Sequence, residues 1–210
     1  MKKYIAEALG TFALVFCGTG AIELNALLHG GSGLAGVALV FGAIVLLMVR
    51  MLAPISGAHL NPAVTIALAM GGKFHWRSVA PYVASQLAGA LCASLLVLVL
   101  FAASTTLGAT IPAGSPMLSF VVEVLLTFLL MAVIFSVSKS GRTMSATLIG
   151  ITVGLEAYVA GPLTGASMNP ARSIAPQLVT GDVRFFWLYT LAPITGALLA
   201  VWASRRSTGA

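Results

Sequence analysis

Two octapeptides decide how this chain folds, and they are near copies of each other. The first reads Ser56-Gly57-Ala58-His59-Leu60-Asn61-Pro62-Ala63, and the second reads Thr164-Gly165-Ala166-Ser167-Met168-Asn169-Pro170-Ala171. Asparagine is favoured before a helix because its side chain caps the first turn. Proline is favoured at the first helical residue, whose N–H has no partner within the helix. Both octapeptides therefore predict a helix that begins at Asn-Pro.

The two predicted helices, at about 62–70 and 170–178, are apolar but short. At 1.5 Å per residue, nine residues cover about 13 Å, which is less than half of the roughly 30 Å hydrocarbon core of a bilayer. Irregular backbone at membrane depth is tolerated only where protein buries it or a watery cavity solvates it. We therefore expect two re-entrant half-helices whose connections face a pore.

The rest of the chain is composed for lipid. Hydrophobic residues make up 59% of the 210 residues and charged residues only 8%, so the chain cannot cover a water-facing surface with polar groups. Apolar runs bounded by Gly, Pro, Ser or charged residues predict six spans. The sequence thus predicts an all-α membrane protein, with transmembrane helices near 4–24, 34–53, 79–103, 117–138, 143–161 and 185–203.

The two halves of the chain form an internal repeat. The segment Ala6-Glu7-Ala8-Leu9-Gly10-Thr11-Phe12 aligns with Val122-Glu123-Val124-Leu125-Leu126-Thr127-Phe128, and the match between the two octapeptides is stronger still. Three full spans, an odd number, separate equivalent points, so the second half is inserted upside down. We expect one transmembrane channel domain over 1–210, with repeat 1 at about 1–103 and repeat 2 at about 117–204.

Basic residues predict the orientation. The net charge is +6, but the basic residues are scattered singly, which argues against a nucleic-acid partner. Lysine and arginine concentrate in cytoplasmic loops, which places both termini in the cytoplasm and the chain in the cell membrane, inner or plasma. The residues that share this side are Lys2, Lys3, Arg50, Lys73, Arg77, Lys139, Arg142, Arg205 and Arg206.

The paired motifs predict a permeation mechanism. With its side-chain oxygen occupied by the cap, each asparagine keeps amide donors, and those of Asn61 and Asn169 are expected to point into the lumen. Water held by two donors cannot relay a proton, and the positive ends of two helix dipoles repel cations. Arg172 lies at a depth where charge is expensive, so it is expected to act at a constriction; an interfacial anchor is the alternative.

At these residues the chain resembles the major intrinsic protein family, the aquaporins and glycerol facilitators, of bacterial type. The resemblance covers nearly the whole length through the paired Asn-Pro-Ala motifs, Asn61-Pro62-Ala63 and Asn169-Pro170-Ala171, the AEALGTF opening and the six spans. It implies the aquaporin fold, homotetramers in the lipid bilayer with one pore per subunit, and no cofactor. It also implies a selectivity filter at Phe41, Ala157, Ala166 and Arg172.

The resemblance leaves the solute range open. Strict water channels usually carry histidine where this chain has Ala157, whereas Ser173 matches the water-channel pattern. The run Gly161-Pro162-Leu163-Thr164-Gly165 is similar to glycerol facilitators and to the plant nodulin-like branch. We expect passage of water and of small uncharged solutes such as glycerol and undissociated metalloid acids; a strictly water-selective channel is the alternative.

Other polar residues have two interpretations each. Glu7 and Glu123 are either proton-relay carboxylates or, as the resemblance implies, braces for the loops before each Asn-Pro-Ala. Glu156 either accepts hydrogen bonds from loop backbone or faces the vestibule. His59 either lies at the lumen wall or packs in the core. A ladder of pore-facing carbonyls is expected at Gly57, Ala58, His59, Gly165 and Ser167.

Three other classes of protein are disfavoured. A secondary transporter also uses inverted repeats and broken helices, but no acidic residue lies near Asn61 or Asn169 in the sequence. A scaffold is disfavoured by short uncharged connections, and an enzyme by the lack of a nucleophile, base or metal cluster in the pore-facing segments. Cys17 and Cys92 lie in apolar stretches without metal-ligand spacing and are expected to be core residues.

Overall fold

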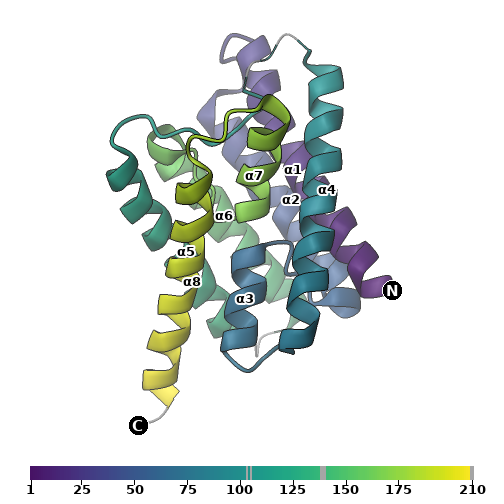
Figure 1. The fold of residues 1–210 in the computed structure, drawn as a ribbon, viewed down its shortest axis with the longest axis vertical. Coiled ribbons are helices and arrows are strands. Elements are labelled where there is room, and N and C mark those ends of the chain that lie inside the picture. Colours follow the sequence, from purple (N-terminus) through teal and green to yellow (C-terminus); the bar gives the residue numbers. More distant parts are fainter. Residues whose placement is uncertain (103, 105, 138–140, 209–210) are drawn as a thin grey trace.

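The computed structural model describes residues 1–102, 104, 106–137 and 141–208 as a bundle of helices (Figure 1). The predicted span ends at 103 and 138, and Lys139, lie outside these residues. The elements are α1 Lys2–Leu27, α2 Gly33–Ser56, α3 Pro62–Met70, η1 Trp76–Ser78, α4 Val79–Leu100, α5 Pro116–Val137, α6 Arg142–Thr164, α7 Pro170–Thr180 and α8 Phe186–Thr208.

Within the described residues, six helices are long and apolar enough to span a bilayer, as predicted. Their outward surface is also apolar: Leu39 and Val99 are 72% and 74% exposed, which would be costly in water but suits contact with lipid tails. The half-helices α3 and α7 contain nine and eleven residues, too few to cross. The predicted fold class is therefore confirmed.

The ends of α2 and α6 differ from prediction. Both helices were expected to stop near a proline, yet each continues through it, past Pro54 and Pro162, for two more residues. Each ends at a glycine in the left-handed conformation, Gly57 with φ 89° and Gly165 with φ 80°. Glycine adopts this conformation without the steric cost that a Cβ would bring. The glycine cap, rather than the proline, therefore sets the boundary.

The packing follows the internal repeat. In the first half, helix α1 packs on α4 and on α2. In the second half, the equivalent helix α5 packs on α8 and on α6. Half-helix α3 packs against α8 of the other half, and α7 against α4. The two halves meet through α2 against α6 and α3 against α7. Each half thus supplies the wall for the half-helix of the other.

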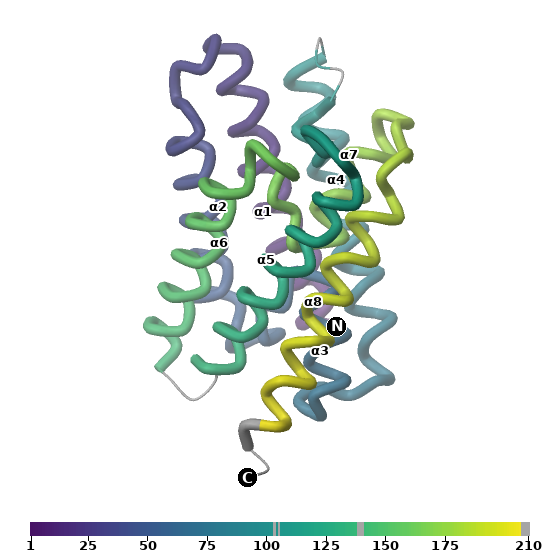
Figure 2. The backbone as a smooth tube through the Cα atoms, turned by 90° about the vertical axis from the view of Figure 1, so that its left-hand side faces the viewer, coloured from purple at the N-terminus to yellow at the C-terminus, as the bar shows by residue number. Residues whose placement is uncertain are grey.

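The half-helices enter the bundle from opposite ends. In Figure 1, α3 lies in the lower part and α7 in the upper part, and Figure 2 shows the same arrangement after a 90° turn. Both termini lie in the lower half of the view, the N-terminus level with α3 and the C-terminus at the bottom. The basic residues at that end bond across it: Lys3 donates to Ser78, and Arg205 donates to the carbonyl of Met70. The N-terminal tips of α3 and α7 meet in the middle.

Two glycines allow the closest helix contacts. A Cβ built on Gly89 of α4 would lie 2.0 Å from the carbonyl oxygen of Ala8 in α1, and one on Gly196 of α8 would lie 2.2 Å from that of Val124 in α5. Because both contacts are with backbone, a neighbouring side chain cannot rotate away. Glycine at these equivalent positions lets the backbone of α4 contact that of α1, and the backbone of α8 contact that of α5.

We expect Gly89→Ala to lower the free energy of unfolding by about 1–3 kcal/mol, the range for overpacked sites. The matched control is Gly20→Ala in α1, where the added Cβ meets no atom within 4 Å. Thermal unfolding of both variants in detergent measures the difference. Equal Tm values for the two variants would show that α1 and α4 can move apart without loss of stability.

Candidate functional site

The two asparagines cap their half-helices as predicted. The Asn61 Oδ1 atom accepts a hydrogen bond from the Ala63 N–H at 2.9 Å, and Asn169 Oδ1 accepts one from the Ala171 N–H at 3.0 Å. Each asparagine has extended backbone and is followed by proline at the first helical position. The caps fix both side-chain amides in orientation, because the oxygen atom is held on the helix side.

Each asparagine also reaches across to the other half. Asn61 Nδ2 donates to the carbonyl of Met168 at 2.7 Å, and Asn169 Nδ2 donates to the carbonyl of Leu60 at 2.8 Å. An amide nitrogen has two hydrogens, so each side chain keeps one donor. The sequence suggested that both remain available to the lumen. In the structure, each asparagine uses one of its two amide hydrogens, because the half-helix tips lie close enough for each side chain to bond to the opposite connection.

Both asparagines line one cavity of about 110 Å³. Since one water needs roughly 10–15 Å³ of such space, the cavity has room for several. Its wall combines apolar side chains from four long helices with the two half-helix connections. The predicted site residues that line it are Phe41, Gly57, Ala58, His59, Asn61, Ala166, Ser167, Asn169 and Arg172. Ala157 and Gly165 are outside this lining set.

The connections before the half-helices have an unusual backbone. Ala58 and Leu60 have φ values of 49° and 53°, and their repeat equivalents Ala166 and Met168 have 43° and 53°. Residues other than glycine rarely adopt this left-handed region, at a cost of order 1–3 kcal/mol each. The same conformation occurs at equivalent positions in both halves, so it belongs to the architecture of the site.

Two buried carboxylates hold these connections. Glu7 accepts from the N–H groups of His59 at 3.0 Å and Leu60 at 2.7 Å, while Glu123 accepts from those of Ser167 and Met168, both at 2.8 Å. A third bond comes to Glu7 from Gln86 Nε2 and to Glu123 from Thr164 Oγ1. The fold therefore brings acidic residues beside both asparagines, although Glu7 and Glu123 lie far from them along the sequence. Their oxygens are engaged with the backbone.

Two tyrosines support the same connections, and the sequence reasoning missed them. The Tyr82 hydroxyl donates to the carbonyl of Ser56 at 2.8 Å, and the Tyr189 hydroxyl donates to that of Thr164 at 2.6 Å. Ser56 and Thr164 are equivalent in the repeat. Their separations from the tyrosines, 26 and 25 residues, are nearly equal, and this spacing is the signal that could have identified the pair.

Arg172 is buried beside the cavity. Its side chain is 1% exposed, its Nη1 donates to the carbonyl of Gly108 at 2.8 Å, and its guanidinium carbon lies 5.3 Å from the centre of the Phe41 ring. Within the described part of the chain, Nε and Nη2 have no hydrogen-bond acceptor. The arginine is therefore held at Nη1 by the Gly108 carbonyl and across the Phe41 ring, while two of its nitrogens bond to no described residue.

In each half, a hydrogen-bond relay between side chains connects the residue two before the asparagine to the residue four after it. His59 Nδ1 lies 3.2 Å from Thr65 Oγ1, and Ser167 Oγ hydrogen-bonds to Ser173 Oγ. In the second half the relay extends to Thr110, whose Oγ1 donates to Ser173 Oγ at 2.8 Å. His59 lines the cavity and also packs 4.7 Å from the Phe74 ring, so both interpretations of this residue apply.

Glu156 fits neither predicted role. It is buried at 7% exposure, yet among the described residues neither carboxyl oxygen has a hydrogen-bond donor, and it does not line the cavity. Of the cysteines, Cys17 is half-buried, whereas Cys92 is exposed and was wrongly expected in the core. No metal-binding cluster occurs among the residues described.

Comparison with known proteins now identifies this architecture. Residues 1–204 match the family described as Major intrinsic protein. The chain belongs to the major intrinsic protein family. This confirms the resemblance inferred from the paired motifs, and a membrane channel, rather than an enzyme, follows from it.

Relatives of this major intrinsic protein include plant aquaporins. It is 42% identical over 207 residues to aquaporin NIP1-1 of Zea mays, covering 97% of this chain and 73% of the relative. It is 39% identical to the putative aquaporin NIP4-1 of Arabidopsis thaliana, covering 94% and 71%. These relatives support the nodulin-like features, whereas a bacterial type stays a prediction.

A solved structure shares the fold. The X-ray structure of the aquaglyceroporin from Plasmodium falciparum superimposes with a TM-score of 0.87 at 26% identity, covering 96% of this chain and 93% of that one. The six spans and two half-helices of this major intrinsic protein thus have the same arrangement as in a known channel.

We expect Glu123→Leu to destabilise the protein, because it leaves the N–H groups of Ser167 and Met168 without acceptors at about 1–3 kcal/mol each. The matched control is Glu156→Leu, which removes a buried glutamate of the same half whose oxygens accept no bond within the described residues. Thermal unfolding in detergent compares them. A loss for Glu156→Leu as large as that for Glu123→Leu would contradict the bracing role.

Proposed function

We propose that this protein is a passive channel for water and small uncharged solutes that excludes protons and ions. The observation that carries the proposal is the single cavity lined by both asparagines. Each amide nitrogen has one hydrogen engaged on the opposite connection and one remaining. A water at this point therefore meets two donors from opposite half-helices.

Two donors at one point block proton relay. A water whose oxygen accepts from both amides directs its own hydrogens away from the midpoint, so the waters on the two sides are oriented oppositely. The N-terminal ends of α3 and α7 add the positive ends of two helix dipoles at the same place. Cations lose hydration there without gaining a compensating acceptor, while neutral molecules pass.

A wide and weakly polar filter supports passage of solutes larger than water. We propose that Phe41, Ala157, Ala166 and Arg172 form this filter. Phe41 and Ala157 belong to the same buried cluster as Ala166, and Arg172 packs over Phe41. Two alanines leave space beside the aromatic ring, and the Arg172 donors without protein acceptors can bind a hydroxyl. The alternative is a strictly water-selective channel.

Stopped-flow light scattering on proteoliposomes tests the solute range. We expect osmotic water flux, glycerol uptake and boric acid uptake all to exceed those of empty liposomes, and a pH-sensitive dye inside the vesicles to report no added proton leak. Water flux alone would establish the strictly water-selective alternative. A proton leak would contradict the orientation mechanism.

We expect Ala157→His to reduce glycerol uptake by roughly tenfold or more while water flux persists, because the ring fills space needed by the larger solute. The control is Val159→His, which places the same ring on the same helix at a position that is 69% exposed on the outside of the bundle. Both variants are measured in the same flux assay. Equal glycerol uptake by the two would remove Ala157 from the filter.

We also propose the orientation and the assembly. Lys3 and Arg205, near the two termini, lie at the same end of the bundle as Met70 and Ser78, and a basic end favours the cytoplasm. Homotetramers in the cell membrane are proposed from the family resemblance, with one pore in each subunit. Protease protection of tagged termini in sealed vesicles and the mass of the detergent-solubilised particle test these two proposals.

A further inference from the structure

A second hollow of about 290 Å³ lies at the end of the bundle opposite the termini, between the α4–α5 connection and the C-terminal end of α7. It shares no lining residue with the pore cavity. Its volume greatly exceeds the roughly 10–15 Å³ of such space that one water needs. The side chains with polar groups that line it are Thr106, Thr110, Gln177, Thr180, Asp182 and Arg184.

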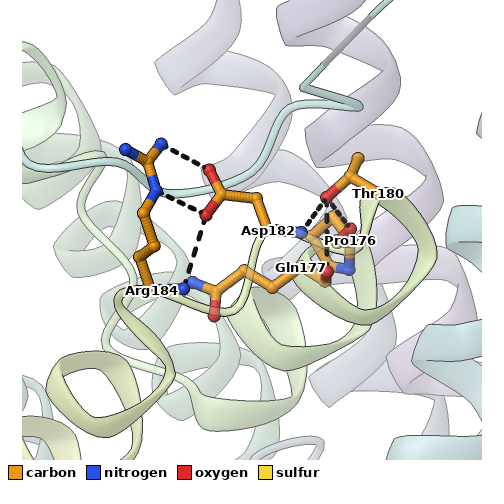
Figure 3. A network of polar contacts seen from close by, with 5 residues as sticks. All are labelled: Pro176, Gln177, Thr180, Asp182 and Arg184. Atoms are coloured by element: carbon orange, nitrogen blue, oxygen red, sulfur yellow. Dashed lines mark hydrogen bonds and ion pairs between the residues drawn. The ribbon is translucent and has the colours of Figure 1, made fainter.

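Gln177 is the side chain in this hollow whose bonding is incomplete. It is 2% exposed, and among the described residues neither Oε1 nor Nε2 has a hydrogen-bond partner. Figure 3 shows its amide extending toward Asp182 and Arg184. Buried amides are normally hydrogen-bonded, so a ligand that both donates and accepts would complete the bonding of this one.

The charges in the hollow neutralise each other. Arg184 Nη2 and Nε bond to the Asp182 carboxylate at 2.7 and 2.8 Å (Figure 3). Hydrogen bonding from Arg184 lowers the pKa of Asp182, and the same bond raises the pKa of Arg184, so both remain charged and paired. An ionic ligand would have to compete with this pair. A neutral ligand with several hydroxyls matches an amide, threonine hydroxyls and a closed ion pair.

We propose that this hollow is a second, non-conducting binding site for a small neutral polyol, centred on Gln177. It goes beyond the proposed channel function, because a molecule held there lies outside the pore. Two parts of the chain build the site: Thr106 and Thr110 come from the connection between the repeats, and the other polar residues come from α7 and the turn that follows it.

The same connection joins the hollow to Arg172. The carbonyl of Gly108 accepts from Arg172 Nη1, and the Gly108 N–H donates to the Glu23 carboxylate. Thr110, two residues on, bonds to Ser173, which bonds to the pore-lining Ser167. A polyol that bridges Gln177 to the connection therefore restrains the backbone that positions the arginine. Occupancy of the hollow reduces local opening of residues 106–111.

Hydrogen exchange measures this restraint without any flux. The full-length protein in nanodiscs is titrated with glycerol, and exchange is followed in the peptide that contains residues 106–111. We expect saturable slowing, reaching roughly tenfold at a glycerol concentration about ten times the dissociation constant. General exclusion of glycerol from protein surfaces would instead slow exchange in proportion to concentration in every mobile segment.

Two variants locate the effect. Gln177→Leu removes the amide while keeping a side chain of similar size, and we expect it to abolish the saturable slowing. Thr180→Val removes a hydroxyl from the hollow and is expected to weaken the slowing, which provides a test if Gln177→Leu does not fold. Thr190→Val is the control, because Thr190, like Thr180, bonds to the carbonyl four residues earlier but lies outside the hollow.

Glycerol bound in the pore could also slow exchange near Arg172. Because Gln177 and Thr180 do not line the pore cavity, such an effect would survive unchanged in both variants. Saturable slowing that persists in Gln177→Leu and Thr180→Val would therefore overturn the proposal. Slowing that stays linear in glycerol and equal in all four proteins would overturn it as well.

Discussion

Backbone N–H groups in the middle of a bilayer must find acceptors within the protein, and this requirement shapes the whole molecule. The connections before the half-helices leave four such groups at membrane depth, at His59, Leu60, Ser167 and Met168. Glu7 and Glu123 accept from all four. An unsatisfied group in hydrocarbon costs several kcal/mol, so irregular backbone can persist here only with these carboxylates. The half-helices and the cavity between them both depend on this bonding.

The two halves stabilise each other at the midpoint. Each asparagine uses its oxygen on its own half-helix and one amide hydrogen on the other half. The tips are thus joined by reciprocal bonds that an inverted repeat naturally provides, since any contact from half one to half two has an equivalent in return. This joint opposes the large rearrangement that a transporter would need between its two access states.

Function resides where the symmetry is broken. The residue three after Asn61 is Val64, whereas the residue three after Asn169 is Arg172, and both line the cavity. The relay from His59 to Thr65 continues to Gln86 in α4, while the relay from Ser167 to Ser173 continues to Thr110 in the α4–α5 connection. One half therefore contributes an apolar side chain at this position, and the other contributes the arginine and a polar link to the second hollow.

The sequence by itself determined the fold class, because its signals are local. Apolar runs set the six spans, and Asn-Pro set the starts of α3 and α7, since caps and proline act within one turn. The repeat also pointed to Glu7 and Glu123 as a pair. Only the tertiary structure decided what these residues contact. The bond from Asn61 to Met168 spans 107 positions, and that from Asn169 to Leu60 spans 109. Tyr82, Tyr189 and the hollow around Gln177 likewise arise from segments brought together by folding, and a pattern along the chain does not record such distant contacts.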